Sequence, residues 1–491
     1  LHLLSRRQRQ MCIRDRFLRR RTRGLLFATL LFLLSSCTIG YHEDESFESD
    51  VKNATLESPQ LENVKVELDA TGENATIEWP VVHGAEGYEF SWYVVDDPEN
   101  PIAVVEGEFI DGCSVELEVE EDTKYKFLIK TIGNKQFNNK DAEKACEISF
   151  STLLETYASI PSGVDLTQWF IDNPLPETDM EPNEDGTLKE LAYELEANGE
   201  YTISGPIDFG ARKVTIRGNK INHSKITFGQ SGRILTQNGL KIKFMDFYCN
   251  AMEKGSSDAS LIGLSKTPNE QLKVSSGEYV IKDPIVIQSC NVYDLNRHLL
   301  YDSGKKYCVE NFTVKASFIR CNQSNTIVYF NKGSFINITF KESTLCSTVQ
   351  NGSYFAQVNG NRPNKITGYS NGTFNFYNCT VYNLAYSKDF TNWNSYRGQA
   401  CLTLNFSRTI FVDCGKGDMT NKIMGNANMS RNFEYNTYWY NGSQSNDKYD
   451  TNTLDTDPGF INAVNGDFTV TGASQLEKRT GDPRWLPLVE E

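Results

Sequence analysis

A short strand pattern recurs along the second half of the chain, and it constrains the fold more than any other feature of the sequence. Segments such as TFNFYNCTVYNL, residues 373–384, alternate apolar and polar residues, as half-buried strands do. The apolar residue that begins each core falls in one column, with steps of 43, 27, 26, 36 and 30 residues: Phe244, Ile287, Val314, Phe340, Phe376 and Phe406. A coil of a parallel β-helix takes about 20–30 residues, and insertions enlarge some coils. We therefore predict an all-β protein in which residues 199–491 form a parallel β-helix with a C-terminal tail.

One position in this pattern holds only small side chains. Its occupants are Cys290, Ser317, Ser343, Cys379 and Thr409. Coils that stack place like residues above like residues, so this slot predicts interior packing and not metal chemistry. The cysteines that follow residue 37 include no CxxC pair, which also disfavours a zinc or redox site. A β-sandwich or a propeller built from similar strands is the alternative, although no WD-like or kelch-like turn recurs.

The first 55 residues have the pattern of a leader and a tether. Residues 1–16 resemble translated adapter sequence from metagenomic assembly, and we expect them to be a sequencing artefact. Residues 17–36 combine a basic flank with a ten-residue apolar run, as a signal peptide does, and the run leads into LSSC. This box resembles that of bacterial lipoproteins, which implies a lipid on Cys37 and anchoring in the outer membrane, facing the cell exterior. An ordinary signal peptide is the alternative. Residues 37–55 then form an acidic tether.

Residues 56–153 contain short strands of period two separated by turn signals. They resemble a fibronectin type III module, in which Trp79 stands at the core tryptophan and Tyr125 at the tyrosine-corner position. Such a module usually spaces or presents other domains, so we expect no chemistry from it. Residues 154–198 include a short amphipathic helical pattern and a loop rich in proline and acid, and we expect a linker and a cap of the β-helix there.

The end of the chain supports this architecture by resemblance. The segments TDPGFINAVNGDFTV (456–470) and GDPRWLP (481–487) are similar to the tail of a Bacteroidota surface lipoprotein family of uncharacterised function. Members pair a fibronectin-type module with a right-handed parallel β-helix of the pectin-lyase-like fold, and their genes often lie in polysaccharide-utilisation loci. The resemblance implies the same fold here, and other surface glycan-utilisation proteins as partners. It assigns no catalytic residue.

Charge divides the chain into two unlike halves. Residues 37–200 carry a net charge of −30, whereas residues 201–491 carry +7. The basic half should attract polyanions, and acidic polysaccharides are the abundant polyanions outside a cell. No groove-reading motif accompanies this charge, so we do not expect nucleic acid as a partner.

One inserted loop, residues 382–399, gathers side chains suited to an acidic sugar. Lys388 and Arg397 could bind carboxylates, and three aromatic rings could stack on sugar faces. These rings belong to Tyr386, Trp393 and Tyr396. A long loop whose aromatic residues fold against the helix flank is the alternative.

A second candidate is NGNRPNKITG (359–368), in which Arg362 resembles the first arginine of a pectate-lyase motif. The second arginine of that motif is missing, because Ile366 stands in its place. Arg320 could add to a basic groove. A lyase of this class could use calcium, but the aspartates are scattered and form no recurring pair, so we expect no cofactor for a binding protein and Ca²⁺ only for a lyase.

These features predict a cell-surface lipoprotein that binds acidic, pectin-like polyuronate through a basic face of its β-helix. Binding needs only that charged, aromatic face. The first alternative is a polysaccharide lyase that acts by β-elimination, which also needs a base and a charge stabiliser in register. Lys388, Arg397 and Arg362 are the candidates for that role, but they do not assemble into a convincing site, so we lean towards a protein that is not an enzyme. The second alternative is a structural or adhesive surface protein that binds no carbohydrate.

Overall fold

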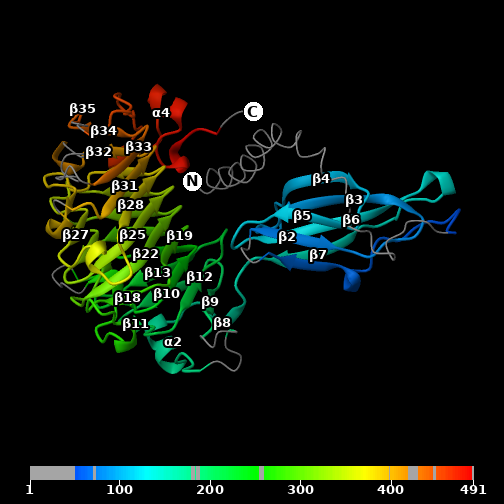
Figure 1. The fold of residues 1–491 in the computed structure, drawn as a ribbon, viewed down its shortest axis with the longest axis horizontal. Helices are drawn as coiled ribbons and strands as arrows, with labels where there is room; N and C mark the ends of the chain where they lie inside the picture. Colours follow the sequence, from blue (N-terminus) through cyan, green and yellow to red (C-terminus); the bar gives the residue numbers. More distant parts are fainter. Residues whose placement is uncertain are drawn as a thin grey trace. The chain divides into compact units, whose positions relative to one another are not determined.

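The computed structural model describes residues 50–69, 73–178, 183, 188–253, 259–396, 399–417, 429–445 and 449–488. The chain divides into two compact units, Leu1–Glu155 and Thr156–Glu491. Strands dominate both units (Figure 1), as the sequence predicts. The expected lipid site at Cys37 lies outside the described residues, as do the expected artefact and signal peptide. Across the described residues, no helix has both the length and the apolar character needed to cross a membrane.

The first unit is an antiparallel sandwich of two sheets. One sheet contains β1 (Lys65–Leu68), β2 (Asn74–Glu78) and β5 (Ser114–Glu118) in that order. The other has the order β4 (Ile102–Ile110), β3 (Ala85–Val94), β6 (Lys124–Gly133) and β7 (Cys146–Ser151).

Two residues that the sequence singled out hold this sandwich together. Trp79 is buried and packs edge-on against the Tyr88 ring, with centroids 5.4 Å apart. The Tyr125 hydroxyl accepts a hydrogen bond from the Glu120 backbone N–H at 2.6 Å, which fixes the corner before β6. This is the geometry expected of a tyrosine corner, so both residues act in packing and turn formation.

The second unit is a parallel β-helix, because successive strands of the chain enter three different sheets in a fixed rotation. In the described residues, sheet 1 contains β8 (Thr156–Ile160), β9 (Leu191–Leu195), β12 (Val214–Arg217), β15 (Leu240–Lys243), β19 (Ile285–Gln288), β22 (Tyr307–Lys315), β25 (Ser334–Lys341), β28 (Gly372–Tyr377), β31 (Leu402–Ser407) and β33 (Ser430–Glu434), with β18 (Tyr279–Ile281) beside β22. Sheet 2 contains β10 (Glu200–Ile203), β13 (Ser224–Phe228), β16 (Met245–Tyr248), β20 (Asn291–Leu295), β23 (Phe318–Cys321), β26 (Thr344–Ser347), β29 (Thr380–Tyr382), β32 (Ile410–Val412), β34 (Thr437–Tyr440) and β35 (Ser443–Gln444). Sheet 3 contains β11 (Pro206–Asp208), β14 (Arg233–Thr236), β17 (Ser260–Leu264), β21 (His298–Tyr301), β24 (Val328–Phe330), β27 (Ala356–Val358) and β30 (Thr391–Asn392).

The predicted apolar column is confirmed from Ile287 onwards and is wrong at its first member. The Cα partner of Ile287 on the preceding coil is Ile242, two residues before Phe244. Phe244 lies instead at a corner with a φ of 61°, where the chain leaves sheet 1. The column also extends one coil beyond the prediction, because Phe433 pairs with Phe406.

The small-residue slot lies inside the corner between sheets 1 and 2. The Ser317 hydroxyl accepts a hydrogen bond from the Cys290 N–H at 3.1 Å and donates to the Lys315 carbonyl at 2.8 Å. Ser343 repeats both bonds one coil later. The residue just before each of the five slot residues has a left-handed φ: Ser289, Ala316, Glu342, Asn378 and Arg408. The slot is therefore structural, as predicted, because it satisfies backbone groups where the chain turns.

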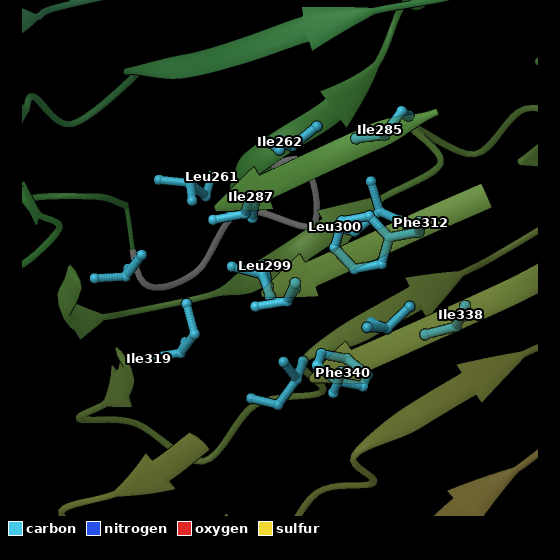
Figure 2. Close-up of a cluster of buried hydrophobic side chains, with 14 of the residues drawn as sticks. Leu261, Ile262, Ile285, Ile287, Leu299, Leu300, Phe312, Ile319, Ile338 and Phe340 are labelled. Atoms are coloured by element: carbon cyan, nitrogen blue, oxygen red, sulfur yellow. The ribbon is translucent and has the colours of Figure 1, made fainter. Parts of the chain in front are cut away.

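The interior of the β-helix is a continuous apolar core. Figure 2 shows part of it, where Ile285 and Ile287 of β19 meet Phe312 of β22 and Leu300 of β21. Further along, aromatic rings stack between coils, and the centroids of Phe340 and Phe376 lie 4.9 Å apart. Stacked coils bury side chains that no single coil could bury, which accounts for the repeat.

The β-helix begins before residue 199, within the segment expected to be a linker and cap. Strands β8 and β9 already belong to sheet 1, and β9 pairs in parallel with β12. The helix α2 (Leu166–Asp172) lies between them, as its amphipathic pattern predicts. Its Asp165 side chain accepts a hydrogen bond from the Thr167 N–H, and its buried residues join the main core.

The end of the chain folds back on the outer surface of sheet 2. This C-terminal segment, residues 456–488, includes the helix α4 (Ala473–Lys478). Its Trp485 indole donates to the Thr344 hydroxyl on β26 at 2.7 Å, and its Phe468 ring contacts Tyr382 on β29. Part of the outer surface of sheet 2 is therefore covered by the chain itself.

The corner geometry predicts an unusual response to glycine. Ala316 has a φ of 50°, a conformation that costs an L residue about 1–2 kcal/mol and costs glycine little. Ala316→Gly should raise the free energy of unfolding by roughly 0.5–1 kcal/mol after the backbone entropy of glycine is subtracted. The measurement is the midpoint of chemical unfolding. Ala192→Gly, in the extended strand β9, is the matched control and should lower stability. A loss of stability in both variants would contradict the account of the corner.

Candidate functional site

The structure leaves two of the predicted sugar-binding residues at the surface. Lys388 is exposed and Tyr386 is half-buried. The Tyr386 ring stacks on Tyr440 with centroids 5.2 Å apart, and its hydroxyl donates to Asn441 Oδ1 at 2.7 Å. Tyr386 is thus held by neighbouring side chains, while Lys388 extends into solvent.

Trp393 and Tyr396 do not lie on the surface, and their predicted role in stacking on sugar is wrong. Trp393 is 5% exposed and Tyr396 is fully buried. The reason is that β30 pairs with β27 and brings the segment back into sheet 3, which turns the following rings inward. There Tyr396 stacks on Phe335 with centroids 6.0 Å apart. Arg397 lies outside the described residues.

Arg362 joins two loops, the one that follows β27 and the one that follows β30. Its Nη1 donates to the Ser395 carbonyl at 3.2 Å, and its Nε donates to Asn364 Oδ1 at 2.9 Å. The donors of this guanidinium are engaged in holding the fold, which argues against the weak catalytic assignment. Within the described ranges, no group of three or more His, Cys, Asp or Glu side chains is placed to hold a metal ion.

A different arrangement of residues stands out on the outer face of sheet 2. Tyr248 on β16 and Tyr293 on β20 are Cα partners, and their rings stack with centroids 5.4 Å apart. On the next coil the guanidinium of Arg320 lies over the Tyr293 ring, 5.3 Å from its centroid. Successive parallel strands lie about 4.7–4.9 Å apart, so the three side chains form a row along the axis of the β-helix. We call Tyr248, Tyr293 and Arg320 the platform.

A cavity of about 180 Å³ adjoins the platform at Arg320. One wall comes from β26 and the residues after it, and the other from a turn of the C-terminal segment. The lining residues are Arg320, Cys346, Ser347, Thr348, Ala463, Val464, Asn465 and Gly466. The lining thus includes one cationic residue, Arg320, and three polar ones, Ser347, Thr348 and Asn465.

The electrostatics of the platform depend on two arginines and two aspartates. Arg320 Nη2 pairs with Asp294 Oδ1 at 2.9 Å, while within the described residues no group hydrogen-bonds its buried Nε. Burial raises the pKa of Tyr293 to about 12, and the nearby Asp246 also raises it, whereas Arg484 and Arg320 oppose the shift. Arg484 itself lies 5.8 Å from the centroid of the Phe318 ring. Two guanidinium groups therefore flank one tyrosine on a single surface.

Sequence reasoning missed Tyr248, Tyr293 and Arg484, although part of the signal was present. Tyr248 and Tyr293 occupy outward positions of strands in the recurring pattern, which alternation alone could have shown. Alternation could not show which outward residues the C-terminal segment covers. Arg484 comes from that segment, far away in sequence.

Comparisons with known proteins leave the function open. Three family models match parts of the chain: DUF4992, described as a domain of unknown function, over residues 11–198, and the domains of unknown function DUF4957 over 199–348 and DUF5123 over 374–485. No curated protein matches.

Matching solved structures include a pectate lyase of Erwinia chrysanthemi in complex with tetragalacturonic acid, at 9% identity and a TM-score of 0.14, which covers 65% of this chain and 87% of the enzyme chain. A family 28 exopolygalacturonase of Yersinia enterocolitica has 10% identity and a TM-score of 0.17, with coverage of 82% and 98%. Scores this low support no argument, so the β-helix assignment rests on strand pairing.

The C-terminal segment that walls the cavity should make stability depend on pH. Burial raises the pKa of the Asp482 carboxyl from the ordinary 3.8 to about 6, although it accepts hydrogen bonds from the Thr344 hydroxyl and the Arg484 N–H. A raised pKa means that the folded state holds the proton more tightly than the unfolded state. Stability should therefore fall as pH rises from about 4 to about 6, by roughly 2–3 kcal/mol, and then level off.

Asp482→Asn should remove this slope. The measurement is the midpoint of chemical unfolding at several pH values between 4 and 7, for the variant and the wild-type chain. An equal fall with pH in both proteins would contradict the assignment.

Proposed function

We propose that this protein binds acidic polysaccharide of the polyuronate type through the platform of Tyr248, Tyr293 and Arg320. The observation that carries the proposal is the row itself: two stacked rings and a guanidinium follow one another along the coils, beside a polar cavity. A uronate chain repeats an apolar sugar face and a carboxylate. The platform offers a complement to each.

The Tyr248 ring supplies apolar surface that a sugar ring can cover, and the Tyr293 ring, which lies between Tyr248 and the Arg320 guanidinium, holds it in place. Tyr248 is 37% exposed, and its stack on Tyr293 fixes both rings before a ligand binds. Binding then costs little side-chain conformational entropy. Rings fixed in this way bind at lower entropic cost than rings on a mobile loop.

The guanidinium supplies the charge. Arginine presents donors that match a carboxylate, and the Arg320 side chain is 31% exposed beside its partner Asp294. Residues 201–491 carry a net +7, but residues 156–200 of the same β-helix unit carry −10, so attraction of a polyanion depends on the local charge at the platform and not on the charge of the whole unit. Lys388 and Tyr386 form a second candidate contact for the same ligand. We propose no nucleic-acid partner.

The platform suits binding better than elimination. A lyase needs a base beside the bound sugar, and Arg320 is already engaged in an ion pair with Asp294. The two histidines of the β-helix are also engaged. His223 Nδ1 lies 2.9 Å from Asp246 Oδ1, and burial lowers the pKa of His298 to about 4. We therefore keep a lyase, with or without Ca²⁺, as the alternative, and an adhesive role as the second.

We further propose that the protein is a surface lipoprotein, anchored through Cys37. The acidic tether and the sandwich would then hold the β-helix away from an anionic membrane, where other glycan-utilisation proteins could meet it. The order of basic flank, apolar run and LSSC supports this location.

Substitutions on the platform should weaken binding to polygalacturonate. Hydrogen bonds to charged groups contribute about 1.5–3 kcal/mol, and partial exposure reduces this, so Arg320→Ala should raise Kd about 10-fold. Arg320→Lys should lie between, because it keeps the charge and loses the planar fork. Tyr248→Ala should raise Kd several-fold. Affinity electrophoresis and titration calorimetry measure both effects.

The matched controls are Lys225→Ala, which removes an exposed cation on β13 of the same sheet, and Tyr157→Ala, which removes an exposed ring on β8. Both should retain wild-type affinity. Equal losses in the controls and the platform variants would contradict a binding site at the platform. Growth of ultraviolet absorbance from unsaturated uronate ends would instead establish the lyase.

The lipid anchor has its own test. Expressed with its leader in a Gram-negative host that is fed labelled palmitate, the chain should carry the label, and Cys37→Ser should lose it and be released from the membrane fraction. Retention of label in the Cys37→Ser chain would contradict the lipobox assignment.

A further inference from the structure

The platform is open at one end and closed at the other. The outward positions run along sheet 2 from Tyr248 through Tyr293 to Arg320, and the next position is Cys346, the Cα partner of Arg320. Tyr248 is 37% exposed, whereas Cys346 is 3% exposed. The exposed fraction of the outward residues therefore falls steeply within a few coils.

The C-terminal segment closes the row. Cys346 belongs to one apolar cluster with Phe468 and Trp485, and Ala463 packs against this cluster. One coil further, Tyr382 contacts the Phe468 ring with centroids 5.4 Å apart. A sugar chain that follows the platform past Arg320 would therefore meet protein and not open surface.

The closing wall is a fixed turn. The backbone groups of Asn462 and Asp467 exchange two hydrogen bonds of 3.0 Å, and the Gly466 N–H donates to the Ala463 carbonyl. Gly466 has a φ of 85°, which glycine adopts without strain. The wall can therefore resist displacement by a ligand.

The cavity between platform and wall is small. Its volume of about 180 Å³ lies below the roughly 300–1,000 Å³ of a typical ligand pocket. Its lining residues include Arg320 and the polar residues Ser347, Thr348 and Asn465. This suits one charged sugar unit better than a chain that continues in both directions.

We propose that the protein recognises the end of a uronate chain, with the terminal sugar in this cavity and the preceding sugars running past Tyr293 to Tyr248. The inference rests on the proposed function and adds the mode of recognition. Recognition of ends would let the protein collect chains that have already been cut, since cutting creates ends. The class of reaction that supplies its ligand is then depolymerisation of an acidic polysaccharide.

The test is the stoichiometry of binding to oligogalacturonates of defined length, for example 4, 8 and 16 units. End recognition predicts one protein per chain at every length, measured by titration calorimetry of the full mature chain. A number of proteins per chain that grows with length would overturn the inference and leave the proposed function intact. Absence of binding at every length would overturn both.

A variant separates the cavity from the rest of the platform. Thr348→Trp should fill the cavity from its exposed rim, and it should raise Kd for the 4-unit chain at least 10-fold. Val349→Trp alters the next residue, which is 39% exposed and does not line the cavity, and should bind as the wild type does. Unchanged affinity of Thr348→Trp would contradict a terminal sugar in this cavity.

Discussion

In-register pairing of parallel strands is the constraint on which the β-helix depends. Each coil satisfies its backbone groups only through the coils before and after it, so inward residues such as Phe340, Phe376 and Phe406 must fall in one column. The same register places outward residues in columns as well. Tyr248 and Tyr293 stack for the reason that the core phenylalanines stack, and a repeat selected for burial thereby also builds a surface that repeats along the axis.

The repeat could be predicted from the sequence because two independent patterns of the core residues indicate it: their alternation with polar residues and their regular spacing along the chain. The predicted column began at Phe244, whereas the residue in register is Ile242, two positions earlier. Phe244 was chosen because it is the larger apolar side chain, and the sequence does not show that it lies at a corner with a left-handed φ. The prediction also placed Trp393 and Tyr396 in solvent. An aromatic residue in a long polar loop looks the same in sequence whether the loop stays out or, as here, returns to a sheet.

The candidate site could not be predicted, because it depends on contacts between residues far apart in the chain. Arg484 and Phe318 are neighbours only because the C-terminal segment folds back on sheet 2. That segment decides which outward residues stay exposed, and it also provides the wall of the cavity. Which surface residues a distant segment covers depends on tertiary structure, and local periodicity in the sequence does not predict it.

The most direct measurement is a crystal structure of the protein with a bound hexagalacturonate. The account predicts a sugar ring over Tyr248, a carboxylate at Arg320, and the terminal unit against the turn at Ala463–Asn465. Sugar density on sheet 1 or sheet 3, with an empty platform, would contradict the central claim.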